Sequence, residues 1–511
     1  MAWMRMMGAD SVAYHRATVL GRSDDHRGQA LDYYVSRGDT PLVWGGAGAP
    51  ALGLSGAVTG DEYEAIFGPG GARDPLSGAR LVATKRPGME LVISAHKSVA
   101  ELGVIGRAEH MHLIMDAERD ATLAYLDRVT RARGGRRGRS ATASRTGGLL
   151  YAHTRHATSR AGDPCPHDHV LVANVVEMLD GRGGWKAADT VLWREHLHAA
   201  TMAGRHAAAR VAVELGYRIE SDDGRSGLLR HWRIAGVPDE VLVLHSKRSA
   251  EIDEAVGERG EGSYRARSVA ARATRSGKRY DTEADLVARW QAELTDAGWP
   301  PERLLGAIDA AAGTPAVQLA VSSVRKVLAE VVAGDSQLAR RKVFARRHLL
   351  VELAPYFYGH EPQVLDAVVD RALADPEVVP LVGVAGARDR MYSLASVLAR
   401  ETAIADSVAR QLARSDAPTV DGSIVRAEIV AAEARIGGRL SAGQREAAVT
   451  ICTSGRGAEM VVGVADPTSQ CLFLSIWPLI WSSCGDEPCV SQRIFPGRGF
   501  VAGRWWAGLC N

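Results

Sequence analysis

Three histidines in this sequence have a spacing that suits a metal site. His167 and His169 are separated by one residue and stand directly before an aliphatic run at 170–176. Such a run, rich in β-branched residues, predicts a buried strand, on which residues i and i+2 face the same side of a sheet. His156 follows a second strand-like run at 149–153, so a neighbouring strand can supply a third imidazole. Three neutral imidazoles leave coordination positions open at a bound metal, and a substrate can occupy them.

Two of these assignments have an ordinary structural alternative. An HxH pair alone is also typical of the polar face of a strand, and it is the third histidine at this spacing that favours a metal site. Glu90 opens the strand-like run at 90–94. It is either a solvated carboxylate at a strand edge or a group beside the histidines that orients an imidazole or accepts a proton.

Tyrosines near the N-terminus offer a different kind of chemistry. Tyr14 and the pair Tyr33-Tyr34 lie in a polar stretch that we expect to be mobile. One interpretation is surface or half-buried rings with the hydroxyl in water. The other is covalent catalysis, because a phenolate attacks a phosphodiester and holds it as a phosphotyrosine. The tyrosines alone do not decide between these interpretations.

An arginine-rich segment without acidic residues leads into the strand of His156. A solvated loop is one interpretation of such a segment, and an arm that follows a phosphate backbone is the other. Its arginines include Arg131, Arg133, Arg136, Arg137 and Arg139.

Composition limits the class of protein without naming a partner. A chain of 511 residues that is 46% hydrophobic is long enough for more than one domain. Lys and Arg number 62 against 60 Asp and Glu, so any basic surface must be local. The sequence shows no signal-peptide pattern and no apolar run near the roughly 18 residues that span a membrane. Six cysteines form no disulfide framework, and we predict a cytoplasmic protein without membrane insertion.

Several elements that must position these residues can be read from periodicity. Helical patterns cover residues 98–130 and 192–215, and a glycine-rich turn at 180–184 predicts a hairpin. Beyond about residue 315 the pattern is that of long amphipathic helices. From Asp466 onward the chain is rich in glycine, proline and serine, and tryptophan and cysteine are concentrated there.

These features resemble the TrwC/TraI-type conjugative relaxases, the MobF class of HUH endonucleases, in which a relaxase domain is fused to a helicase. The resemblance extends from about residue 14 to residue 465, and the histidine spacing with its Thr-Ser-Arg insert is its most specific part. It is carried by Asp32-Tyr33-Tyr34, Trp44, Leu52-Gly53-Leu54-Ser55-Gly56, Arg86-Pro87-Gly88, Lys97-Ser98, His156, Thr158-Ser159-Arg160 and His167-Asp168-His169 through Asn174.

The resemblance implies a role for the metal-site residues. His156, His167 and His169 would be the metal ligands, with Mg²⁺ or Mn²⁺ as the ion in use. Three imidazoles also suit Zn²⁺ or Ni²⁺, and spacing does not choose among these ions. Glu90 takes the place of a supporting aspartate in the family. Because glutamate is one methylene longer, the geometry around the histidines must adjust.

The resemblance also implies the nucleophiles and the DNA contacts. Tyr14 and Tyr33 would be the two nucleophiles, with Tyr34 beside the second. His15 stands where the family often has a second tyrosine next to the first. The arginines named above, together with Arg160, would contact single-stranded DNA.

The implied function is site- and strand-specific nicking and rejoining of DNA at a plasmid origin of transfer, through a 5′-phosphotyrosyl intermediate. Partners would be single-stranded origin DNA, and with it accessory relaxosome proteins and a coupling ATPase. Two alternatives stay open at this point. A rolling-circle replication initiator uses the same chemistry, and a decayed mobile element could leave a non-catalytic DNA-binding remnant.

The expected fold class is α+β, an antiparallel sheet of the HUH relaxase type covered by helices and followed by a mostly helical region. We expect a relaxase domain at 1–312, a helical fragment of a helicase-like region at 313–465, and an aberrant or disordered tail at 466–511. The helicase resemblance stops where a G-x-x-x-x-G-K-[ST] phosphate-binding loop is due, and Asp466-Pro467-Thr468 follows instead. We therefore expect a truncated or frameshifted product without ATPase activity.

Overall fold

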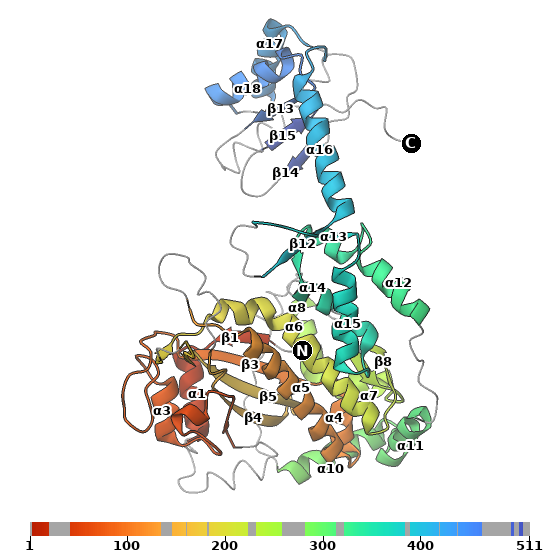
Figure 1. Ribbon diagram of the computed structural model, residues 1–511. Coiled ribbons are helices and arrows are strands. Elements are labelled where there is room, and N and C mark those ends of the chain that lie inside the picture. Colours follow the sequence, from red (N-terminus) through yellow and green to blue (C-terminus); the bar gives the residue numbers. More distant parts are fainter. Residues whose placement is uncertain are drawn as a thin grey trace. The chain divides into compact units, whose positions relative to one another are not determined.

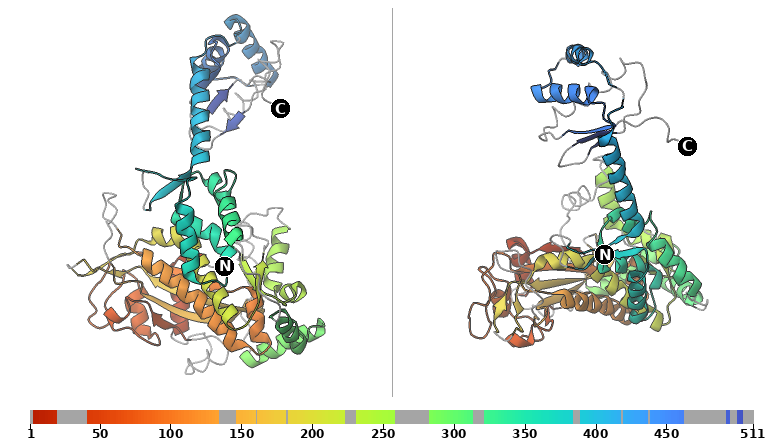
Figure 2. Two further views of the ribbon diagram at one scale, coloured as in Figure 1. Left: turned by 45° about the vertical axis from the view of Figure 1, so that its right-hand side comes forward. Right: turned by 45° about the horizontal axis from the view of Figure 1, so that its top comes forward.

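The computed structural model (Figures 1 and 2) divides the chain into two compact units, Met1–Leu394 and Ala395–Asn511, and each is described by itself. The structure describes residues 3–19, 41–133, 146–159, 161–180, 183–222, 231–257, 282–312, 321–383, 389–417, 419–436, 438–461, 492–494 and 500–503. The predicted boundaries at 312 and 465 stay predictions.

A five-stranded antiparallel sheet forms the centre of the first unit, as the α+β prediction required. Its strand order is β1-β3-β5-β4-β2, so β5 is central and neither β3 nor β5 is an edge strand. The strands are β1 (Trp3–Met6), β2 (Val43–Gly45), β3 (Gly88–Ser94), β4 (Tyr151–Thr158) and β5 (Pro164–Ala173). The sequence did not predict β1, which is four residues long and only partly buried.

Apolar side chains alternate along these strands and so make two cores, one on each face. One face packs against α5 (Ala108–Val129) and α6 (Thr190–Glu214), through Leu123 and Trp193 among others. The other face packs against α3 (Gly60–Phe67) and the segments around it. In Figure 1, α5 and α3 lie on either side of the sheet. For brevity, the face toward α5 and α6 is called the back face and the other the front face.

The helix predicted at 98–130 is interrupted in the structure. It forms α4 (Lys97–Val104) and α5, which are separated at Gly106, whose φ is 83°. A left-handed residue ends a helix and is tolerated by glycine, which has no Cβ. The predicted helix at 192–215 is confirmed as α6, and the predicted hairpin as β6 (Val176–Glu177) paired with β7 (Trp185–Lys186).

Further elements complete the first unit. The region beyond residue 315 is mostly helical, as predicted, and it also contains a three-stranded sheet of order β10-β12-β11 that the sequence did not predict. The remaining elements are α1 (Ala9–Val19), η1 (Pro50–Leu52), β8 (Ile219–Asp222), β9 (His231–Ile234), α7 (Asp239–Leu244), α8 (Lys247–Gly257), α10 (Glu283–Asp296), α11 (Pro301–Ala312), α12 (Val321–Val331), α13 (Gln337–Arg341), β10 (Phe344–Ala345), α14 (Arg346–Leu353), η2 (Ala354–Phe357), α15 (Pro362–Leu373), β11 (Val378–Pro380) and β12 (Met391–Leu394).

The second unit is mostly helical. It contains α16 (Ala395–Ala413), α17 (Gly422–Ile436), α18 (Ala442–Thr453), β13 (Ala458–Val461), β14 (Gln492–Ile494) and β15 (Phe500–Gly503). Helix α18 begins after Ser441, whose hydroxyl accepts from the Gln444 amide in a capping box. Most of the predicted tail lies outside the described residues. Among the helices that the structure describes, none has the length and apolarity to cross a bilayer.

Candidate active site

The three predicted histidines converge on the front face of the sheet. His156 on β4 is the cross-strand partner of His167 on β5, and His169 lies two residues further along β5. The ring centroids are 5.4 Å apart for His156 and His167, 4.7 Å for His156 and His169, and 5.1 Å for His167 and His169. Alternation along the strand placed His167 and His169 on one side of the sheet, and the neighbouring strand β4 brings His156 to the same side.

This donor set fits a divalent metal ion. One nitrogen of each of the three rings lies within 4.8 Å of the other two. Metal–nitrogen bonds of about 2.1 Å need nitrogens roughly 3–3.5 Å apart, a difference that small side-chain rotations close. His167 Nδ1 lies 2.7 Å from the carbonyl oxygen of Cys165, and His169 Nδ1 lies 2.8 Å from Glu90 Oε1. These bonds direct the Nε2 atoms of both rings toward a metal.

Glu90 is a buried carboxylate beside the histidines, not a solvated edge residue. It lies on β3, is 0% exposed, and its Oε2 accepts hydrogen bonds from Arg5 Nε at 2.8 Å and Ser11 Oγ at 3.0 Å. Burial raises the pKa of the Glu90 carboxyl, but the imidazoles of His15 and His169 outweigh burial and hold this pKa well below its usual range. Glu90 is therefore ionised and orients the His169 ring.

Burial has the opposite effect on the imidazole. It lowers the pKa of His169, and the hydrogen bond to Glu90 only partly offsets this effect. A neutral imidazole is the form that binds a metal. The structure therefore prepares this ring for coordination.

Tyr14 lies on helix α1, in contrast to the mobile segment expected from the sequence. Its ring makes an edge contact with His15, with centroids 5.0 Å apart, and His15 in turn contacts His169 at 5.7 Å. Tyr14 is 38% exposed, whereas His15 is 1% exposed and its Nε2 lies 3.6 Å from Glu90 Oε1. Helix α1 thus brings Tyr14 to the edge of the histidine cluster with its ring open to solvent.

Several predicted site residues lie outside the described residues. These are Tyr33, Tyr34, Arg136, Arg137, Arg139 and Arg160. Of the remaining arginines, Arg131 directs its guanidinium to the carbonyl oxygens of Arg128 and Thr130, and Arg133 is exposed. Both follow the end of α5.

Sequence reasoning missed Arg5 and Ser11. Arg5 forms an ion pair with Glu90 at 2.6 Å and is the cross-strand partner of Glu90 in the β1–β3 pairing. The only signal in the sequence is an arginine within the apolar run Trp3-Met4-Arg5-Met6. Its partner stands 85 residues later, and no local pattern identifies a pair so far apart.

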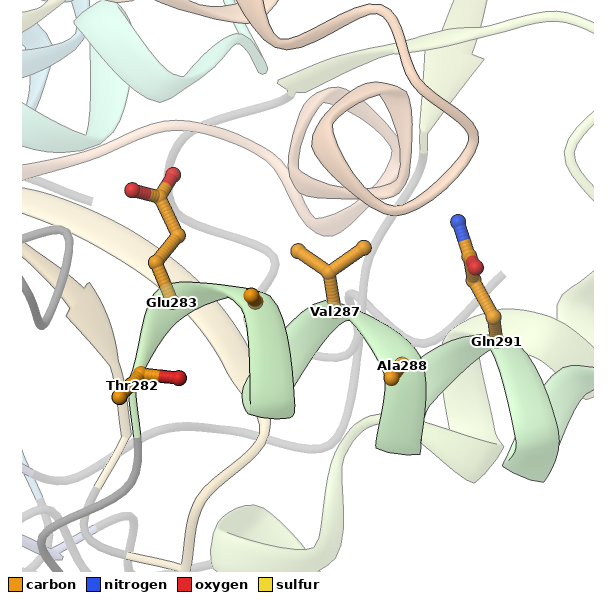
Figure 3. A pocket seen from close by; sticks show the side chains of 6 residues that line it. Thr282, Glu283, Val287, Ala288 and Gln291 are labelled. Carbon is orange, nitrogen blue, oxygen red and sulfur yellow. The ribbon is translucent and has the colours of Figure 1, made fainter.

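Two hollows lie elsewhere in the first unit. One of about 650 Å³ runs along α10, where Glu283, Val287 and Gln291 project from one side of the helix (Figure 3). None of the predicted site residues that the structure describes lines it. The other, of about 560 Å³, has one wall formed by Gly8 and by Val12, Ala13 and Arg16 of α1, and includes Lys85.

Several known proteins are similar to this chain. The family model described as TrwC relaxase matches residues 9–297. The multifunctional conjugation protein TraI of Escherichia coli is 29% identical over 382 residues, which cover 69% of this chain and 21% of TraI. TraI of Escherichia coli strain K12 matches to the same extent. This chain thus spans about a fifth of the length of these curated relatives.

Solved structures with a similar fold include the conjugative relaxase TrwC in complex with oriT DNA, in a metal-bound form. It covers 59% of this chain and 100% of its own, at 22% identity and a TM-score of 0.48. A copper-bound form of the same complex has 24% identity and a TM-score of 0.48.

Proposed function

This chain belongs to the TrwC relaxase family, and we propose that it nicks and rejoins one DNA strand at an origin of transfer, initiating conjugative transfer. The observation that carries the proposal is the convergence of His156, His167 and His169 beside the tyrosine-bearing helix α1. TraI, its relative, is a conjugation protein.

The three histidines would hold a divalent ion, with Mg²⁺ or Mn²⁺ as our assignment. When bound, the ion polarises the scissile phosphate and neutralises charge on its oxygens. The contribution of Glu90 is positional, because it fixes the ring of His169 through Nδ1. Arg5 forms an ion pair with Glu90, so that the negative charge of this buried carboxylate is compensated.

We assign Tyr14 as the nucleophile of the first cleavage step. Its phenol oxygen attacks phosphorus, a new P–O bond forms, and the bond from phosphorus to the 3′ oxygen breaks. The phenol proton is lost and the departing 3′ oxygen gains one, so that the products are a 3′-hydroxyl and a 5′-phosphotyrosyl adduct. Attack of a 3′-hydroxyl on the adduct reverses the step. Tyr33, with Tyr34 beside it, would serve the second strand transfer.

Single-stranded DNA would be held by arginines in the parts of the chain between α5 and β4 and between β4 and β5. We assign Arg131, Arg133, Arg136, Arg137, Arg139 and Arg160 to this contact, because guanidinium groups pair with phosphates and stack on bases. Accessory relaxosome proteins and a coupling ATPase are further proposed partners. We assign no ATP-dependent step to this chain, and place its work in the cytoplasm.

A trapping experiment tests the proposal. The protein is incubated with Mn²⁺ and a labelled library of single-stranded oligonucleotides, and covalent adducts are isolated and mapped by peptide sequencing. We expect an adduct on Tyr14 that chelation of the metal prevents. Tyr14→Phe should abolish this adduct, whereas Tyr33→Phe should retain it. DNA attached to Tyr33 in the parent protein would reverse the order of the two tyrosines, and the absence of any adduct would refute nicking.

A further inference from the structure

The residue between two of the site histidines is a buried acid that faces the other side of the sheet. Asp168 is 0% exposed, and its carboxylate accepts two hydrogen bonds from Arg155, from Nε at 2.8 Å and from a terminal nitrogen at 2.8 Å. Arg155 is itself only 6% exposed. This is a bidentate, charge-assisted ion pair, which is among the strongest and most directional interactions that side chains form.

Helix α5 completes a network around this pair. The guanidinium of Arg155 also donates to Asp116 Oδ1 at 2.9 Å, and its other terminal nitrogen lies 3.0 Å from His112 Nδ1. Asp116 is held in turn by Arg119 at 2.6 Å. The network therefore ties β4 and β5 to the helix behind them.

The place of this pair in the strand register is what links it to the metal site. Arg155 and Asp168 are cross-strand partners, and they stand between the pairs His156–His167 and Thr154–His169. Directly after His156 the register becomes irregular. A slip of one residue turns every side chain of a strand to the opposite face, which would exchange a histidine for Asp168.

Stability alone does not account for a buried ion pair of this kind. Removing two charges from water is costly, and apolar residues of similar volume often replace such pairs without loss of stability. In some proteins a buried polar group fixes the register of its element, as a single buried asparagine does in coiled coils, and a directional pair is suited to that role.

We propose that Arg155 and Asp168 are positioning residues of the metal site, which hold the three imidazoles in the geometry for coordination from the back of the sheet. The inference rests on the metal site of the proposed function. It adds that the geometry of the front face depends on a named charge pair on the back face.

The test measures metal binding without DNA. Co²⁺ is titrated into the full-length protein, and its visible absorption reports both affinity and coordination geometry. Asp168→Asn keeps the size of the side chain but removes its charge. Arg155→Lys keeps the positive charge, but a lysine cannot form the bidentate pair of hydrogen bonds. We expect each to weaken Co²⁺ binding about 10–100-fold and to alter the spectrum, as for other residues that support metal ligands.

A second buried pair provides the matched control. Glu101 on α4 and His245 are both 0% exposed and lie 2.9 Å apart, and neither flanks a site histidine. Glu101→Gln should lower the melting temperature while leaving the affinity and spectrum of Co²⁺ unchanged. Should Asp168→Asn not fold, Asp116→Asn replaces it, because Asp116 is 44% exposed and lies outside the sheet. This variant should weaken Co²⁺ binding several-fold.

The outcomes separate the inference from the proposed function. Variants of Arg155, Asp168 and Asp116 that match the parent protein in Co²⁺ affinity and spectrum would overturn the inference, whatever their melting temperatures. A parent protein that binds no Co²⁺ would refute the metal site itself, and with it this inference.

Discussion

Hydrogen bonds within the protein orient the individual residues of the site. His167 and His169 each commit Nδ1 to an acceptor in the protein, so rotation of either ring costs a hydrogen bond. Glu90 in turn is held by Arg5 and Ser11. The ligand atoms are therefore oriented before a metal arrives, which lowers the cost of binding it.

Loss of one histidine should remove metal binding and leave the fold intact. His167→Ala or His169→Ala deletes a ligand on a partly exposed face, and nicking should fall by roughly 10²–10³-fold, since metal polarisation contributes several kcal/mol. His153→Ala is the matched control, because His153 lies on the adjacent strand β4 and pairs with Val170 on the back face. Calorimetric metal titration and a nicking assay decide the matter. Undiminished binding in the two site variants would remove them from the metal centre.

Removal of the charge on Glu90 should weaken the site without destroying it. Glu90→Gln preserves size, but it replaces an anionic acceptor of the His169 hydrogen bond and leaves Arg5 without its counter-charge. We expect metal affinity or nicking rate to fall about 10–100-fold. Metal titration at constant pH measures this change, and kinetics equal to those of the parent protein would contradict the role.

Helices α5 and α6 lie in close contact behind the sheet. Helices α5 and α6 pack closely enough that Gly204 of α6 has no room for a side chain. A Cβ there would lie 2.5 Å from the carbonyl oxygen of Glu118 and would also meet Thr122 Oγ1. The two helices support the back face of the sheet, and their spacing depends on this contact.

Substitution of Gly204 by alanine should therefore destabilise the first unit. Alanine favours a helix by about 1 kcal/mol over glycine, but overpacking costs about 1–3 kcal/mol and a backbone oxygen cannot easily move away. Gly306→Ala in α11 is the control, since nothing lies within 4 Å of its Cβ position and stability should rise. Urea denaturation of both variants measures the change in the free energy of unfolding, which should fall for Gly204→Ala and rise for Gly306→Ala. An increase in stability for Gly204→Ala would show that the helices can separate freely.

The length of each element decided whether it could be predicted from the sequence. Strand β5 and helix α6 were predictable because their periodicity is local and unbroken. Strand β1 and the sheet of β10–β12 were not, because strands of two to four residues are too short to show a period. At the site, alternation along a strand could place His167 and His169 on one face. The surroundings of Glu90 could not be placed in this way, because they depend on pairing between residues 5 and 90.

At the scale of the whole molecule, all described residues of the candidate site lie in the unit Met1–Leu394. Deletion of residues 395–511 should therefore leave metal affinity and nicking rate unchanged within about twofold. The measurement is a side-by-side titration and nicking assay of the shortened and full-length chains. A shortened chain that folds but no longer nicks DNA would show that the second unit contributes to catalysis.

The order of the strands in the sheet also has a consequence for protein synthesis. As the chain leaves the ribosome, β1 can pair with β3 and β2 with β4, but these are two separate ribbons. β5 emerges last of the five and joins the ribbons by pairing with both β3 and β4. β5 also carries two of the three histidines. A nascent chain that stops short of β5 therefore has neither the complete five-stranded sheet nor the three metal ligands. Translation of one strand thus completes the five-stranded sheet and the set of three histidines together.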